Sequence, residues 1–446
     1  MDEKLKGVFD YAITAGSTEV FDALAKDFAS FEQEDKDWLL RRTIVYAPNT
    51  AFIQHVLDYG KSLDYKDENG VTLLHGAAIS DHPETVRFFI KKGLDVNAKD
   101  NDGWTPLMAA ARETSSVEML KALIDAGADT AVSYDGWTLL HLAAALNPNA
   151  DITKFFLEQG FDPERRNDTG NTPLMAAARE TGSVEVLKAL IDAGADTAVS
   201  DDDGWTLLHL AAALNPNADI TKFFLEQGFD PERRDDAGRT PLMEAALYQS
   251  NVDVIDLMVK AGADITAKTE RGETLLHLAA MNGESDVVRY LLPSFKATDT
   301  DSSGASCLGN ALVCGTSPET VALLVKDMKA EHIRLACWNE NPEILDALIT
   351  AGYDVNMAGS EGVTPLMWAA HLNTSPDIIR MLRRHNAIWS AVDDMGRNAL
   401  HYAAANEDPA IYDWMLEDNS LKKLAGKKDA DGHEPAYYRE HKDEFK

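Results

Sequence analysis

Cysteine is scarce in this 446-residue chain, which contains only Cys307, Cys314 and Cys337. An odd number without a framework of spacings predicts reduced thiols and an intracellular, cytoplasmic protein. Long apolar runs are also missing, since no stretch approaches the roughly 18 apolar residues of a membrane span. The start, residues 1–7, lacks a basic segment followed by an apolar run, so we expect no secretory signal.

Basic residues are few in comparison with acidic ones. The chain has 42 Lys and Arg against 74 Asp and Glu, a formal net charge of −32 and a pI near 4.6. Nucleic acid is therefore not an expected partner, because a phosphate-binding surface requires clustered basic side chains. A basic protein would be steered towards such a surface. The alternative interpretation is that the acidity only keeps the protein soluble.

Signals of catalysis are missing as well. The sequence shows no Ser/His/Asp set, no phosphate-binding glycine loop and no Cys-His nucleophile pair, so we expect a protein that is not an enzyme. Asp299 to Gly304 resembles the first half of a calcium loop, but Asn310 stands where that loop requires glutamate. We therefore expect no cofactor and no metal.

The dominant feature is a repeat of 33 or 34 residues. Near copies of Asn171-Thr172-Pro173-Leu174-Met175-Ala176-Ala177-Ala178 recur along most of the chain, each preceded by a glycine. The anchoring glycines are Gly70, Gly103, Gly136, Gly170, Gly204, Gly238, Gly272, Gly304, Gly362 and Gly396. A period of this length is typical of a solenoid.

One unit shows why the period folds as it does. Gly170 suits a turn with positive φ, Thr172 can cap a helix, and Pro173 fits the first helical position. The spacing of apolar residues over 184–191 predicts a second amphipathic helix, and Gly194 is the left-handed residue that ends it. The alanine run 176–178 keeps the first helix thin, which lets neighbouring units pack closely.

The Thr-Pro-Leu core and its spacing resemble the ankyrin repeat family. The resemblance implies an all-α solenoid of helix-turn-helix units with β-hairpin loops. About thirteen units spaced roughly 10 Å apart would form a curved, elongated rod on the order of 100 Å long. We expect a monomer, although the sequence does not determine the oligomeric state.

The repeats divide the chain into five segments. Residues 1–69 are interpreted as degenerate N-terminal capping repeats, 70–303 as regular repeats and 304–361 as two divergent, shortened repeats. Residues 362–431 return to the regular pattern, and the polar remnant 432–446 is expected to form one capping helix. Pro293 should end a helix early, and the hairpin between the two shortened repeats should be missing, which would make the solenoid bend within residues 293–335.

Two stretches of the regular segment are nearly identical. Residues 105–166 and 172–234 differ as Ser115 to Gly182, as Met119 to Val186, and by one residue inserted in the hairpin that contains Tyr134 in the first stretch and Asp203 in the second. Duplication of a pair of repeats explains this identity.

Histidines recur once per repeat pair, at positions 75, 141, 209, 277 and 401. They should lie about two layers apart, too far for a shared metal ion. The resemblance implies instead that each makes structural hydrogen bonds between hairpin and helix.

The resemblance also places a recognition surface on the concave side, from the residue after each glycine and the residues after each Ala-Ala pair. The candidate protein-binding residues on the hairpins are Trp104, Trp137, Asn171, Trp205 and Arg239. Those on the helices are Arg112, Glu113, Leu146, Arg179, Glu180, Leu214, Tyr248 and Met281. Trp, Arg and Tyr are enriched in binding hot spots. The alternative is that each indole only packs on a neighbouring hairpin.

Function follows by analogy with the family. We expect a scaffold, adaptor or inhibitor that binds one or more proteins along the concave face. One alternative is an effector delivered into another cell, which would use the same surface on a foreign partner. A second alternative is an enzyme whose activity resides in residues 293–361.

Overall fold

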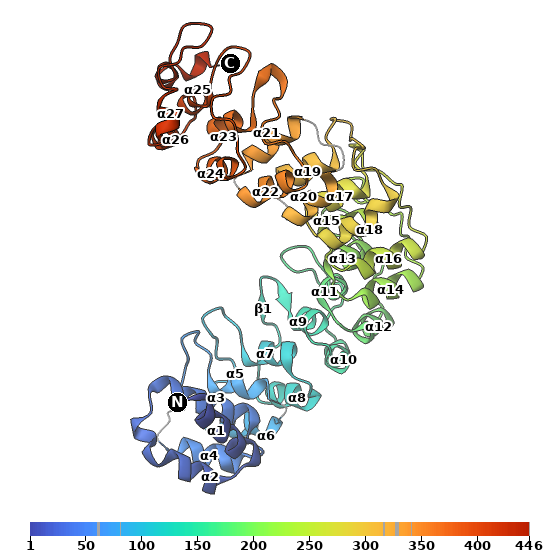
Figure 1. Ribbon diagram of the computed structural model, residues 1–446. Coiled ribbons are helices and arrows are strands. Elements are labelled where there is room, and N and C mark those ends of the chain that lie inside the picture. Colours follow the sequence, from blue (N-terminus) through green and yellow to red (C-terminus); the bar gives the residue numbers. More distant parts are fainter. Residues whose placement is uncertain (60–62, 81, 315–316, 326–329, 340, 446) are drawn as a thin grey trace. The chain divides into compact units, whose positions relative to one another are not determined.

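The computed structural model describes residues 1–59, 63–80, 82–314, 317–325, 330–339 and 341–445. It comprises two compact units: unit 1 contains residues 1–211 and 219–228, and unit 2 contains residues 212–218 and 229–446. Thirteen pairs of helices succeed one another in the described residues (Figure 1). We call the members of each pair the first and the second helix. The all-α architecture of helix pairs predicted from the sequence is confirmed.

The helices up to residue 226 are regular in length from the fourth pair onward. The first helices are α1 (Glu3–Ala15), α3 (Gln33–Tyr46), α5 (Leu73–Ala78), α7 (Pro106–Glu113), α9 (Leu139–Leu146), α11 (Pro173–Glu180) and α13 (Leu207–Leu214). The second helices are α2 (Thr18–Leu24), α4 (Thr50–Leu57), α6 (Pro83–Lys91), α8 (Val117–Asp125), α10 (Ala150–Glu158), α12 (Val184–Asp192) and α14 (Ala218–Glu226). A 3-10 helix, η1 (Ala25–Ser30), follows α2.

The pairs beyond residue 229 lie in unit 2. Their first helices are α15 (Pro241–Tyr248), α17 (Leu275–Asn282), α19 (Cys307–Cys314), α21 (Ala330–Trp338), α23 (Pro365–Leu372) and α25 (Ala399–Ala404). Their second helices are α16 (Val252–Lys260), α18 (Ser285–Leu291), α20 (Pro318–Leu324), α22 (Pro342–Thr350), α24 (Asp377–Arg384) and α26 (Pro409–Leu416). Short elements complete the unit: η2 (Leu292–Ser294), η4 (Ser360–Gly362), α27 (Asn419–Lys422), η5 (Pro435–Arg439) and η6 (Lys442–Glu444).

Local sequence determines where each helix begins and ends. The Thr172 hydroxyl accepts a hydrogen bond from the Met175 amide at 3.3 Å, and Pro173 occupies the first position of α11. Gly170 has φ 77° in the turn before α11, and Gly194 has φ 91° just after α12. The roles predicted for these four residues are confirmed.

First helices pack on first helices and second helices on second helices, so each unit has two layers. In unit 1, α9 packs between α7 and α11, while α10 packs between α8 and α12. Leu174 and Ala177 of α11 are fully buried. Burial of alanine on the faces of thin helices lets the layers approach closely, and within each unit the core is a strip one repeat thick.

The hairpins are tight turns rather than extended strands. Within the described residues, the two named strands are β1 (Ser133–Tyr134) and β2 (Trp137–Thr138), which pair antiparallel. Elsewhere backbone hydrogen bonds close the turn, such as Asp100 N to Trp104 O at 3.0 Å and Gly103 N to Asp100 O at 3.1 Å. Neighbouring hairpins are linked as well, because the Asn101 amide donates to the Asn69 carbonyl at 2.9 Å.

The divergent segment keeps its helix pairs but shortens what lies between them. Helix α18 ends at Leu291 and Pro293 continues in a 3-10 turn, as predicted. Five residues separate α20 from α21, whereas fourteen separate α10 from α11. The predicted absence of a hairpin concerns residues 326–329, which lie outside the described residues.

The prediction of one polar capping helix at the C-terminus is wrong. Residues 434–445 form η5 and η6 instead of one helix, and they carry aromatic contacts. Tyr438 is buried and its hydroxyl donates to Asp429 at 2.7 Å, while the Phe445 ring lies 4.8 Å from that of Tyr402. An isolated helix of this length is marginal. Short 3-10 turns let these rings reach the last regular repeat.

Candidate functional site

Each hairpin holds the residue after its glycine in a fixed position. The Asp100 carboxylate accepts hydrogen bonds from the amides of Asp102 and Trp104, at 3.0 and 2.8 Å. The carbonyl of that last residue then accepts the imidazole N–H of the preceding repeat, since His75 Nε2 lies 3.0 Å from Trp104 O. The backbone of the residue after the glycine therefore makes the hydrogen bonds that hold the hairpin, and these bonds do not involve its side chain.

Three of the recurring histidines, His75, His141 and His401, have the structural role that was predicted. The Nδ1 atom of His141 accepts the Thr138 amide at 3.3 Å, and its Nε2 donates to the Asn171 carbonyl at 3.0 Å. Burial lowers the pKa of His141, which keeps the ring neutral and able to accept and donate at once. In unit 2, His401 Nε2 lies 3.3 Å from the carbonyl of His433 in the same way.

Trp104 lies in a cluster formed by three side chains from two successive repeats. Its ring centroid lies 5.1 Å from the Arg112 guanidinium and 5.8 Å from the ring of Tyr134. Trp104 is half-buried, and Tyr134 and Arg112 are exposed. We call these three residues the Trp104 cluster. A guanidinium over an indole face is an attractive arrangement, and the cluster presents a rigid aromatic surface beside a positive charge.

The other two candidate tryptophans are half-buried and lie against histidines of their own repeats. The Trp137 ring centroid is 6.0 Å from that of His141, and the Trp205 centroid is 6.3 Å from that of His209. Asn171, at the equivalent position, hydrogen-bonds the Thr169 hydroxyl through its amide at 2.9 Å. These two indoles thus contact histidines of their own repeats, which differs from the alternative of packing on a neighbouring hairpin.

The candidate positions at the ends of the first helices face solvent. In unit 1 the exposed ones are Arg112, Glu113, Leu146, Arg179 and Glu180. Arg112 and Glu113 form an ion pair, and Arg179 pairs with Glu180 at 2.9 Å. Such exposed pairs contribute little to stability. Their charged atoms therefore remain accessible to another molecule.

The candidates in unit 2 differ in accessibility. Tyr248 is 52 % exposed, whereas Leu214, Met281 and Arg239 are half-buried. Arg239 pairs with Glu244 of α15 at 3.2 Å, and Glu244 is fully buried. Burial, partly offset by Arg239, raises the pKa of Glu244 to about 7. Arg239 is thus engaged inside its own repeat.

Tyr134 is a member of the cluster that the sequence reasoning missed. The available signal was the duplicated pair, because Ser133-Tyr134-Asp135 in one copy stands where the other has residues 200–203. A hairpin that changes while the helices around it stay nearly identical marks a surface that differs between the copies. We now include Tyr134 among the candidate residues.

The described residues offer little for metal or thiol chemistry. No group of three or more His, Cys, Asp or Glu side chains among them is arranged to hold a metal ion. The Asp301 carboxylate of the calcium-like segment accepts amides of its own hairpin, at 2.8 Å from Ser303 and 2.9 Å from Ala305. Burial raises the pKa of the Cys307 thiol to about 12, which disfavours the reactive thiolate. No described helix combines the length and apolarity needed to traverse a bilayer.

Stacked helix pairs joined by tight hairpins, with a hydrogen bond from a histidine to the carbonyl of the next hairpin that links successive units, define a repeat protein. A model of three ankyrin repeats matches residues 43–134, 129–201, 180–269, 266–334 and 333–425. The chain therefore belongs to the ankyrin repeat family, whose repeats form a protein-interaction module.

Relatives share short stretches of this chain. A putative ankyrin repeat protein of Rickettsia felis is 29% identical over 133 residues, which cover 30% of this chain and 34% of the relative. A putative ankyrin repeat protein of Fowlpox virus is 43% identical over 61 residues, 14% of each chain. Protein phosphatase 1 regulatory subunit 12A of Mus musculus is 45% identical over 58 residues, covering 13% of this chain and 6% of that protein. The matches span about a third or less of each relative.

Proposed function

We propose that this protein is a non-enzymatic scaffold, adaptor or inhibitor that binds a partner protein through the first helices α7, α9 and α11 of unit 1 and the hairpins that precede them. The Trp104 cluster is the centre of the proposed surface. The exposed Leu146 and the Arg179–Glu180 pair lie on the following first helices and extend it. We further propose that the protein acts in the cytoplasm.

The observation that carries this proposal is that the indole of Trp104 is not needed to build its hairpin. The carbonyl of Trp104 accepts His75 at 3.0 Å, and the carbonyl of Asn171 accepts His141 at the same distance. An asparagine therefore serves the hairpin as well as a tryptophan does. A large rigid aromatic side chain at a position that does not require it is best explained by contact with another molecule.

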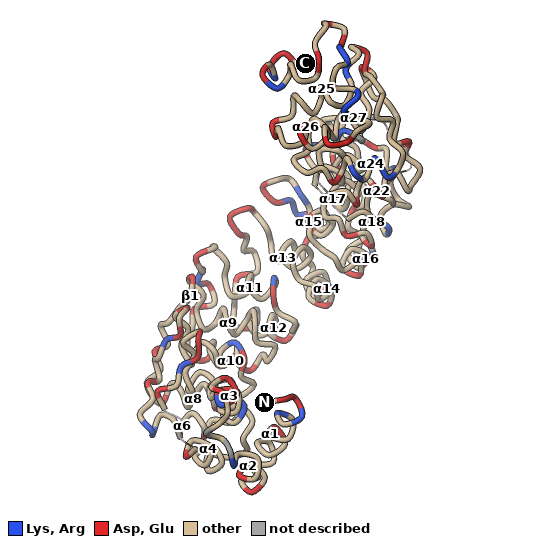
Figure 2. The backbone as a smooth tube through the Cα atoms, turned by 60° about the vertical axis from the view of Figure 1, so that its left-hand side comes forward, with Lys and Arg blue, Asp and Glu red and all other residues tan. Residues whose placement is uncertain are grey.

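The charge around the cluster supports a basic partner. Asp102, Glu113 and Asp135 are exposed on the same hairpins and helix, and Figure 2 shows acidic segments at the ends of the hairpins. A partner with Lys or Arg side chains would be steered towards them, and its rate of association would fall as added salt screens the charges.

The test is a binding experiment with a matched substitution. Trp104→Asn places the residue of the equivalent repeat in the cluster and should leave thermal unfolding nearly unchanged. Proteins captured by the intact chain are identified by mass spectrometry, and binding of each purified candidate is then measured with both forms. We expect a loss of about 2 kcal/mol or more for the specific partner.

The control is Tyr11→Asn, which removes an aromatic side chain that is 67 % exposed on α1, outside the proposed surface. It should bind as the unaltered protein does. If a folded Trp104→Asn variant retains full affinity for every candidate partner, the Trp104 cluster is not the binding site. If that variant loses much of its stability, the indole is chiefly a packing residue.

A further inference from the structure

A second surface of unit 1 is a groove between two successive hairpins. Its walls come from residues 63–66 with Thr72 and from residues 92–99, which follow α6. The cavity has a volume of about 780 Å³, large enough for several side chains of a bound segment. We call it the lysine groove because Lys66, Lys92 and Lys99 line it.

The three lysines are exposed, and none forms an ion pair with any described residue. Lys92 lies over the Phe88 ring at 5.4 Å. Elsewhere in unit 1, lysines of the second helices α8, α10 and α12 pair with acids three residues earlier. These pairs are Lys121 with Glu118 at 2.8 Å, Lys154 with Asp151 at 3.1 Å and Lys188 with Glu185 at 3.7 Å.

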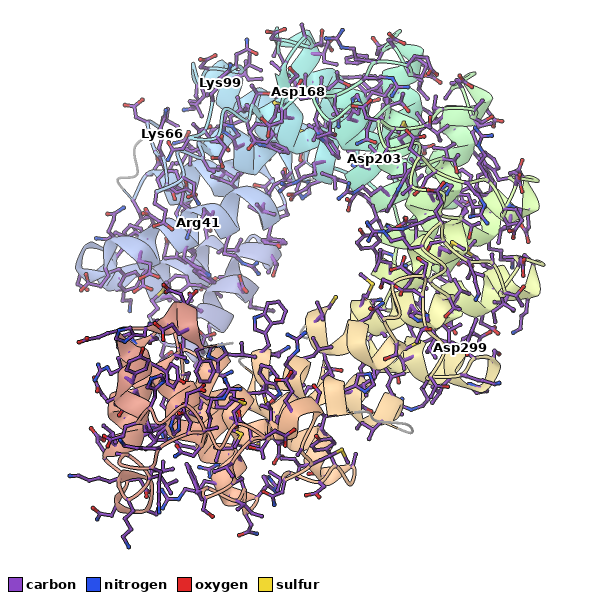
Figure 3. The ribbon with its side chains drawn as sticks, turned by 90° about the horizontal axis from the view of Figure 1, so that it is seen from above. Arg41, Lys66, Lys99, Asp168, Asp203 and Asp299 are labelled. Carbon is purple, nitrogen blue, oxygen red and sulfur yellow. The ribbon has the colours of Figure 1, made fainter. Side chains whose placement is uncertain are left out.

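A basic residue four positions before the anchoring glycine recurs along the chain, and in two later repeats it has a structural role. Arg166 donates to the carbonyls of Gly170 and Ser200, and Arg234 donates to those of Gly238 and Lys268. Lys66 and Lys99 occupy the same position (Figure 3). Neither makes such a bond in the described part of the chain, so their ammonium groups are available to a ligand.

The walls of the groove are held by contacts that leave these lysines unused. The Tyr65 hydroxyl accepts a hydrogen bond from Arg41 at 3.2 Å, and Asn97 donates to the Gly127 carbonyl at 3.1 Å. The Asp95 carboxylate accepts the Asn97 amide at 2.9 Å. A groove with fixed walls and three ammonium groups that have no ion-pair partner among the residues that the structure describes is suited to bind carboxylates, because little ordering of the backbone is required.

The surroundings limit what can enter. Glu68 and Asp102 are exposed at the tips of the two hairpins, and Asp64 and Asp95 line the groove itself. The net charge of the chain is −32. A broad anionic surface such as a membrane, or a nucleic-acid duplex, would bring many negative charges against these carboxylates and be repelled. A narrow peptide strand can place a few carboxylates beside the lysines alone.

We propose that the lysine groove binds an acidic segment of a partner protein. Carboxylates of the segment pair with Lys66, Lys92 and Lys99, and its backbone lies between the two hairpins. This site does not include the Trp104 cluster and does not depend on it. It gives the protein a recognition surface of opposite charge to the one proposed for a basic partner.

The test uses the full chain and a fluorescein-labelled peptide of eight glutamates flanked by glycines. One variant carries Lys66→Gln, Lys92→Gln and Lys99→Gln. The control variant carries Lys121→Gln, Lys154→Gln and Lys188→Gln, which change the net charge by the same amount on the same unit. Binding is measured by fluorescence anisotropy at low salt, and thermal unfolding checks that both variants are folded.

We expect the groove variant to bind the peptide at least tenfold more weakly than the unaltered protein, and the control to bind within twofold of it. Equal weakening in the two variants would show that only overall charge matters and would overturn the proposal. So would failure of the peptide to bind the unaltered protein. Stronger binding, lost in the groove variant, of vesicles containing phosphatidylserine or of a DNA oligonucleotide would assign the groove to that other class of ligand and also overturn it.

Discussion

The regular repeats α9 to α12 and the divergent repeats α19 to α22 are both built from helix pairs, but their successive repeats are linked by different hydrogen bonds. In the regular repeats, His141 connects its own helix cap to the next hairpin. In the divergent repeats this contact is replaced, and the Ser306 hydroxyl lies 3.0 Å from His332 Nε2 of the following first helix. The link between repeats persists although the Thr-x-x-His pattern does not.

The opposite ends of the first helices are linked alike in both regions. Asn147 donates to the carbonyls of Ala111 and Thr114, at 3.1 and 2.9 Å. Asn339 of the divergent region donates to the Leu312 carbonyl at 3.0 Å. A side-chain amide thus satisfies carbonyls that a helix end leaves without partners. The divergent repeats keep one of the two regular links and modify the other, which predicts a weaker interface rather than an absent one.

The largest effect we expect is a difference in local stability between the two regions. Repeat stability is a sum of unit and neighbour terms, and Gly309 inside α19 weakens that helix further. Amide hydrogens of α19 to α21 should exchange roughly 100-fold faster than those of α11 and α12, a difference of about 3 kcal/mol. Hydrogen exchange followed by mass spectrometry measures this. Equal protection of the two regions would contradict the expectation.

The amide links can be compared by substitution. Asn147→Ala leaves two buried carbonyls without their donor and should lower the free energy of unfolding by about 2 kcal/mol. Asn339 is half-buried and serves one carbonyl, so Asn339→Ala should cost about 1 kcal/mol. Urea unfolding gives both values, and Asn97→Ala, which removes an exposed link to the Gly127 carbonyl, gives the cost of such a link in solvent. A larger cost for Asn339 than for Asn147 would show that the divergent region depends more on its remaining link.

Much of the regular fold could be predicted because its signals are local. Gly170, Thr172 and Pro173 act within a few residues, so their chemistry determines the turn and the helix start wherever the motif occurs. The cap at the C-terminus could not be predicted in the same way. Its form depends on the contact between the rings of Phe445 and Tyr402, which are far apart in the sequence.

The candidate site was predictable only in part for a similar reason. The residue after each glycine could be placed on a hairpin, and Trp104 does lie there. The contact of its indole with Tyr134 of the next hairpin could not be predicted, because the two residues are far apart in the repeat pattern. Arg239 was predicted to be available for binding, but it pairs with Glu244 of its own repeat. That position is alanine in two sister repeats, so the repeat pattern did not indicate the pair.

A smaller effect is the pH dependence of stability that the buried carboxyl of Glu244 should cause. The pKa of Glu244 is raised to about 7 in the folded protein, against about 4.5 in a solvated chain. Between these pH values the folded state holds a proton that the unfolded state has released, so stability falls as pH rises from 4.5 to 7. Arg239 and Asp235 are the charged groups beside it. Glu244→Gln should therefore raise stability by about 1–2 kcal/mol at pH 8 and have little effect at pH 4.5.

Urea unfolding at the two pH values decides this prediction, and Glu180→Gln, at an exposed carboxylate of α11, provides the control. A Glu244→Gln variant that is less stable at pH 8 would mean that its pair with Arg239 outweighs the cost of burial. In that case the regular repeats of unit 2 would owe part of their stability to an ion pair that the sister repeats lack.

The smallest effect is the response of the regular repeats to mild acid. Burial lowers the pKa of His141, although its bond to the Asn171 carbonyl acts in the opposite sense, and the Arg165 charge lowers it further. The unfolded chain takes up a proton near pH 6.5 while the folded ring stays neutral, so stability is lost as pH falls below about 6.5.

His141→Gln should be less stable at pH 8, because a helix cap and a link to the next hairpin are weakened. Its unfolding temperature should nevertheless fall less steeply between pH 7 and pH 5.5 than that of the unaltered protein. Equal slopes of unfolding temperature against pH would show that His141 titrates alike in the folded and unfolded states. The acid sensitivity would then have to come from the other buried histidines, His277 and His401, because burial lowers their pKa values as well.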